Sequence, residues 1–158
     1  MTHVKSVRAV ACGVTLCVAL LGPAAGASAS RASIKAAIRS YSGKILIAEG
    51  HVVSALGEYK TTKQPAAAET ALGESVNVLK ALRAKVAAQP ASKPRVKEAK
   101  TKILEGLHAV IVSYTSLATA LDEKASDPTA ATAEAEKFLA AAKKGIKELR
   151  QGTLLLDS

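Results

Sequence analysis

Glutamate and histidine side chains in the middle of the chain are the first candidates for chemistry. Glu105 and His108 form an E-x-x-H step, the pairing that places a carboxylate and an imidazole on one helix face in di-iron bundles. Such a site needs a second E-x-x-H step and two further glutamates, and the sequence contains no second step. We therefore predict no metal site.

The second candidate chemistry is haem ligation by two histidines. On two parallel helices His51 and His108 would lie at similar heights, as bis-histidine ligation requires. Both histidines fall outside the apolar seams described below, and no C-x-x-C-H attachment sequence is present. We expect isolated surface histidines and no cofactor, with a haem or other small-ligand carrier as an alternative.

Catalytic motifs are missing from the sequence. There is no G-x-S-x-G, no phosphate-binding glycine loop and no dinucleotide fingerprint. Tyr41, Tyr59 and Tyr114 occupy positions of apolar periodicity, which favours a place in the core over a catalytic role. We predict no catalytic residue and a protein that is not an enzyme.

The first residues have the order of a secretory signal peptide. Basic Lys5 and Arg8 precede a fourteen-residue apolar core, and small residues suited to cleavage follow it. The core is shorter than the roughly 20 residues that a spanning helix needs, so we expect no stable transmembrane segment. We predict a signal peptide over 1–29, cut after Ala29 or after Ala27, and a secreted, periplasmic or envelope protein. An uncleaved anchor is the alternative.

The remaining residues, 30–158, are predicted to form one all-α domain. Prolines divide them into helices over 31–62, 65–88, 92–125 and 127–154, with Ser92 able to cap the third and Ser126 or Asp127 the fourth. Apolar residues recur at alternating steps of four and three, which is typical of helix bundles. Short connections make consecutive helices antiparallel. We therefore expect an up-down-up-down four-helix bundle; a hairpin array that closes only on dimerisation is the competing architecture.

The apolar seams can be given by residue. The first helix carries Ile34, Ile38, Tyr41, Ile45, Ala48, Val52, Ala55 and Tyr59; the second carries Leu72, Val76, Leu79, Leu82 and Val86. The third carries Val96, Lys100, Ile103, Leu107, Val110, Tyr114, Leu117 and Leu121; the fourth carries Ala131, Ala135, Phe138, Ala142, Ile146 and Leu149. Lys100 is the one charged residue in these seams.

Charge is distributed unevenly over this bundle. The whole chain has a formal charge of +9, and loss of Lys5 and Arg8 leaves +7. Antiparallel packing gathers sixteen basic and four acidic residues at the pole where the first helix starts, against four basic and nine acidic residues at the other pole. The candidate anion-binding residues at the basic pole are Arg83, Lys85, Lys93, Arg95, Lys97, Lys143, Lys144 and Arg150.

Helix stability alone does not account for this pole. Negative charge is favoured at helix amino termini, yet Arg31, Lys35 and Arg39 open the first helix and five basic residues fall within the first eleven of the third. The sequence predicts contact with an anionic membrane surface or polymer; a solvated charged surface is the alternative. The shortage of aromatic residues for base stacking argues against nucleic acid.

Glycines at 43, 50 and 57 recur every seven residues along the first helix. Each costs about 1 kcal/mol of helix stability relative to alanine, and together they lie on the side away from the predicted core. We interpret this file as a face that packs on another helix, within the bundle or across a homodimer. One alternative is that the glycines reflect sequence drift without a packing role, on a helix that tertiary contacts stabilise. Another is a β-hairpin that turns at Glu49 and Gly50.

Overall fold

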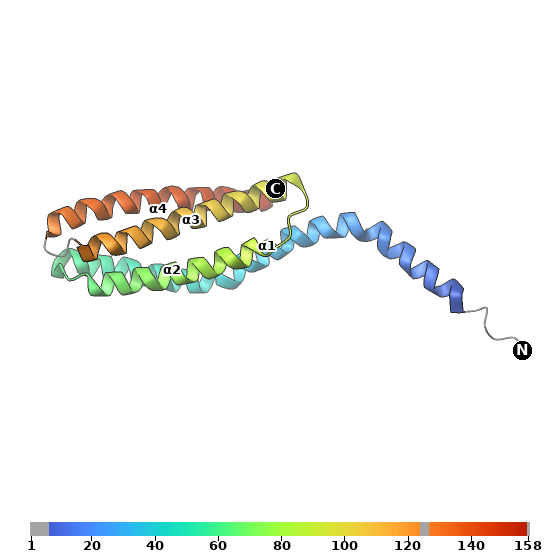
Figure 1. Ribbon diagram of the computed structural model, residues 1–158, viewed down its shortest axis with the longest axis horizontal. Coiled ribbons are helices and arrows are strands. Elements are labelled where there is room, and N and C mark those ends of the chain that lie inside the picture. The colour runs from blue at the N-terminus through green and yellow to red at the C-terminus, as the bar shows by residue number, and fades with distance from the viewer. Residues whose placement is uncertain (1–6, 124–126, 158) are drawn as a thin grey trace, which may run out of the picture.

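The computed structural model describes residues 7–123 and 127–157, with side chains from residue 29 onward except at 128, 131 and 132. It contains four helices, α1 (Val7–Thr62), α2 (Ala66–Ala87), α3 (Pro94–Glu123) and α4 (Pro128–Asp157), and no strand among the described residues (Figure 1). The all-helical, four-helix prediction is confirmed. The predicted end of the third helix at 125 and the alternative cap Ser126 lie outside the described residues.

Helix α1 differs most from its prediction because it starts at Val7 rather than at residue 31. Figure 1 shows its first part projecting past the end of the bundle, and the buried core begins only at Ser30 and Ile34. Residues 7–29 of the predicted signal peptide fall in the projecting part, and the signal peptide remains a prediction. Helix α1 runs without a break through Glu49 and Gly50, so the β-hairpin interpretation is wrong.

Consecutive helices run antiparallel, and the pairs differ in how closely they approach (Figure 1). Helices α3 and α4 are the closest pair, α2 packs along both α1 and α3, and α1 touches α4 at only a few points. The core is continuous across all four helices. The bundle is therefore tight on one side and loose between its first and last helices.

Buried positions follow the predicted seams in three of the helices. In α1, α2 and α3 every seam residue is buried or partly buried, Lys100 included. Helix α4 departs from the prediction because Ile146 is 45% exposed, while Gly145, Gly152 and Leu156 are buried instead. The side chain of Ala131, the first residue of that seam, is outside the described set.

The close approach of α3 and α4 depends on three glycines. A Cβ added to Gly106 would lie 2.6 Å from the carbonyl oxygen of Gly145, and one added to Gly152 would lie 2.8 Å from that of Ala99. These backbones are in direct contact, and no side chain larger than hydrogen fits between them.

The glycine file of α1 behaves differently. A Cβ added to Gly43, Gly50 or Gly57 would meet nothing within 4 Å. The predicted packing of this face inside the bundle is therefore wrong. Packing on a second chain remains a prediction.

Two helix ends are held by side chains. Asp127 Oδ1 accepts a hydrogen bond from the Ala130 N–H at 3.1 Å, which confirms the predicted cap of α4. Lys100 Nζ donates to the carbonyls of Ala87 and Gln89 at 2.7 and 2.6 Å. A cation there compensates the negative end of α2, which explains why a lysine occurs in an apolar seam.

Helix α3 is long and apolar enough to cross a membrane by length and composition, the one such helix in the described part of the chain. Half of its most apolar stretch is buried within the bundle. Core helices of soluble proteins commonly have this length and composition.

Replacing Gly106 by alanine should separate α3 from α4, because the new methyl group would overlap backbone atoms of Gly145 and Leu149. We expect a loss of about 2–3 kcal/mol of unfolding free energy, as for other overpacked cores. Gly43→Ala is the matched control, and it should gain up to about 1 kcal/mol through helix propensity. Urea denaturation followed by circular dichroism measures both; stabilisation of both variants would contradict the close contact.

Candidate functional site

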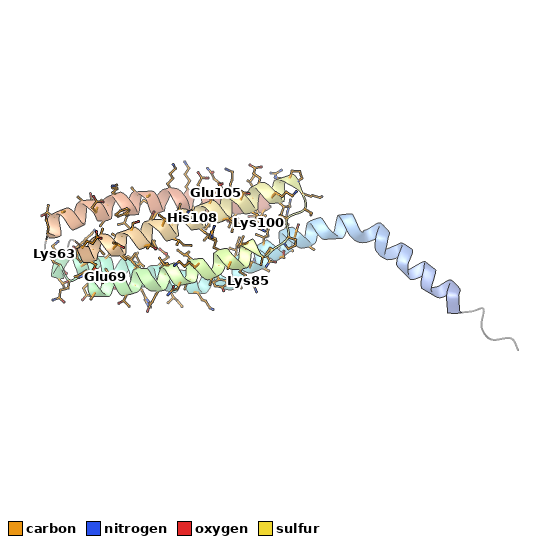
Figure 2. The ribbon with its side chains drawn as sticks, in the orientation of Figure 1. Lys63, Glu69, Lys85, Lys100, Glu105 and His108 are labelled. Carbon is orange, nitrogen blue, oxygen red and sulfur yellow. The ribbon has the colours of Figure 1, made fainter. Side chains whose placement is uncertain are left out.

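The basic pole is the end of the bundle where α1 enters it near Ser30, α2 ends, α3 starts and α4 ends. Figure 1 shows the carboxyl terminus and the α2–α3 connection at this end. Figure 2 shows Lys85 and Lys100 toward it, whereas Lys63 and Glu69 lie at the opposite end. The antiparallel packing thus puts the basic halves of the four helices side by side.

Some of the charge at this pole holds the bundle together. Lys35 Nζ lies 2.6 Å from Asp157 Oδ1 and ties α1 to the end of α4. Lys102 lies 3.9 Å from Glu148 and links α3 to α4. The hydrogen bond from Lys35, aided by its charge and by Arg39 and Arg31, lowers the pKa of the Asp157 carboxyl below its usual range. Two of the four acidic residues are therefore already paired.

The eight candidate anion-binding residues are all exposed, but they do not form one cluster. Lys93, Arg95 and Lys97 lie in and next to the first turn of α3, and we call these three residues the tip of the basic pole. Lys143 and Lys144 lie beside Gly145, which packs on Gly106, twelve residues into α3. At 1.5 Å per residue this position is about 18 Å from the tip, so these two lysines belong to the middle of the bundle.

Arg83 lies in a groove between α2 and α3. Lys80, Arg83 and His108 line the groove together with apolar residues that include Ile111 and Val112, and its volume is about 540 Å³. The groove extends the positive surface from the tip along the side of the bundle. Arg150 on α4 and Lys85 at the end of α2 complete the candidate set.

The structure does not bring the two histidines together. His51 Nδ1 lies 3.3 Å from Glu74 Oε2, in a groove between α1 and α2, whereas His108 lines the α2–α3 groove. Glu105 and His108 are both exposed on α3 (Figure 2). Among the described residues, no group of three His, Cys, Asp or Glu side chains could hold a metal ion.

One polar cluster was missed by the sequence analysis. Both carboxylate oxygens of Glu49 on α1 accept hydrogen bonds, from Ser75 Oγ of α2 at 2.9 Å and from the Tyr114 hydroxyl of α3 at 2.6 Å. Burial, together with the hydrogen bond to Glu49 and its charge, raises the pKa of Tyr114, so the phenol stays protonated and donates. Glu49 directly follows the seam residue Ala48. A carboxylate beside a seam position is the one feature of the sequence that pointed to this cluster.

No protein-family model, curated protein or solved structure matches the chain.

The Lys35–Asp157 pair should make stability depend on pH. An Asp pKa that is lowered in the folded state contributes stability above the unfolded value of about 3.9, and this contribution is lost as the pH falls through the lowered pKa. Lys35→Met should return the Asp157 pKa toward its ordinary value, as measured by carbon-detected NMR titration. Lys97→Met is the control. An unchanged Asp157 pKa in Lys35→Met would contradict the pairing.

Proposed function

We propose that the chain is an exported, non-catalytic helical bundle whose basic pole binds an anionic surface or polymer of the cell envelope. The observation that carries this proposal is the accumulation of lysine and arginine around the amino terminus of α3, where positive charge is disfavoured. Removal of residues 1–29 would leave Arg31, Lys35 and Arg39 near a second helix amino terminus at the same pole. An anionic partner would offset that electrostatic cost. The signal peptide predicted from the sequence is the reason for placing the protein in the cell envelope.

The exposure of Lys93, Arg95 and Lys97 supports the tip as the centre of binding. The acidic residues Asp157 and Glu148 are engaged with Lys35 and Lys102, which lie outside the group Lys93, Arg95 and Lys97. Each exposed lysine or arginine near an anionic membrane contributes about 1 kcal/mol to attraction. A cluster of this kind is enough for reversible, salt-sensitive binding.

Charge reversal at the tip separates binding from folding. Lys93→Glu/Lys97→Glu places acidic residues at the amino terminus of α3, where they favour the helix, and should weaken binding to a dense polyanion at least tenfold. Lys60→Glu/Lys63→Glu changes net charge equally at the opposite pole and should keep most of the affinity. Co-sedimentation with vesicles containing phosphatidylglycerol, and retention on immobilised heparin, measure the two kinds of partner.

Salt dependence provides the second readout of the same experiment. Wild-type binding should fall steeply between low and physiological salt, because exposed charges are screened beyond about 8–10 Å. The proposal is contradicted if the tip variant and the opposite-pole variant bind equally well to both vesicles and heparin.

The exposed apolar residues beside the α1 glycine file favour a second candidate, a homo-oligomeric structural protein. Leu46, Ile47 and Val53 are 75%, 62% and 72% exposed, and they flank glycines that would let another backbone approach closely. In this reading the face packs on its equivalent in a second copy of the chain.

Gly50→Leu tests this candidate, because a leucine would block the close approach of a second helix while nothing within the chain lies near its Cβ. We expect sedimentation velocity to show a concentration-dependent dimer in wild type and a monomer of undiminished stability in Gly50→Leu. A monomeric wild-type protein at all concentrations would eliminate the homo-oligomer.

A further inference from the structure

A cavity of about 250 Å³ lies in the centre of the bundle. Its walls come from all four helices and are apolar, for example Ile45, Leu82, Leu107 and Leu149. Glu49 is the one charged residue that lines it among the described side chains. The cavity therefore combines a hydrocarbon-like interior with a single carboxylate.

The mouth of the cavity lies between α1 and α4. These two helices touch at few points, and the lining residues that they supply, Ile45 of α1 with Ile146 and Leu149 of α4, are partly exposed. The residues from α2 and α3 are buried. An apolar cavity of 150 Å³ is enough to bind benzene, so this larger one can take a small hydrophobic molecule through the loose side of the bundle.

Glu49 has hydrogen-bonding capacity left over. A carboxylate offers about four acceptor sites, and the hydroxyls of Ser75 and Tyr114 occupy two of them. In the described part of the chain no lysine or arginine forms an ion pair with Glu49, although the sequence holds 22 such residues. A carboxylate beside apolar surface that lacks a cation is unfavourable, and a bound cation would remove that cost.

We propose that this cavity binds a small hydrophobic amine, whose ammonium group pairs with Glu49 and whose hydrocarbon part fills the space between the helices. Ser75 and Tyr114 orient the carboxylate from α2 and α3. An anionic ligand is disfavoured by repulsion from Glu49, and a neutral one leaves the carboxylate without a counter-charge. None of the candidate anion-binding residues lines this cavity, and the proposal does not depend on the function proposed for the basic pole.

Calorimetric titration with three probes of similar shape tests the ligand class. Benzylamine should bind at least tenfold more tightly than benzyl alcohol, and phenylacetate should not bind at millimolar concentration. Glu49→Gln keeps the size of the side chain and removes its charge; it should reduce benzylamine affinity at least tenfold, to that of benzyl alcohol, and leave benzyl alcohol unchanged. Equal affinity of the wild type for amine and alcohol, or no heat from benzylamine, would overturn the proposal.

A matched pair of tryptophan variants tests the location. Ile146→Trp places a large side chain in the mouth and should abolish binding of benzylamine, whereas Leu154→Trp, at a 61% exposed position of the same helix, should retain it. Circular dichroism establishes that each variant is folded. Should Ile146→Trp not fold, nuclear Overhauser effects from the benzylamine ring to the methyl groups of Leu107 and Leu149 decide the same question, and their absence in the wild type would contradict this site.

Discussion

The contact between the backbones of α3 and α4 is the constraint on which the rest of the bundle depends. Gly106 and Gly145 leave no room for a methyl group between the two helices. Gly152 makes a second such contact with Ala99, near the start of α3 and the end of α4. Because α4 is drawn so closely to α3, it meets α1 at only a few points. The loose side, the half-exposed Ile146 and the central cavity are consequences of this uneven spacing.

Polar interactions then connect the tight pair to the other two helices. Glu49 joins α1 to α2 and α3 through two hydroxyl groups, Lys100 of α3 closes the end of α2, and Lys35 of α1 reaches the last turn of α4. Hydrogen bonds to charged groups are stronger than those between neutral groups, and exposure to solvent weakens them. These contacts link each helix to its neighbours at defined positions along the bundle.

The sequence predicts much of this architecture and little of its detail. Large apolar residues in α1 and α3 alternate regularly enough to identify the buried face. In α4 the seam runs through Gly145 and Gly152, and a search for large apolar residues places Ile146 there instead. Seven-residue spacing of glycines occurs in both α1 and α4. Among the described residues only the second set packs on a neighbouring helix, where Gly145 meets Gly106 and Gly152 meets Ala99. Spacing within one helix cannot show what lies opposite.

The candidate site, like the fold, could be predicted from the sequence only in part. The sorting of charge to one pole follows from helix direction, which short connections determine, but the position of Lys143 and Lys144 in the middle of the bundle depends on the α3–α4 register. Glu49 could not be identified as a cavity residue, because its partners are 26 and 65 positions away in the sequence. The register itself can be measured directly by a carbon-edited NOESY spectrum of the folded chain. The contact of Gly106 with Gly145 and Leu149 predicts cross-peaks between the α-protons of Gly106 and protons of both residues. Their absence, with Gly106 instead close to residues of another helix, would contradict this register.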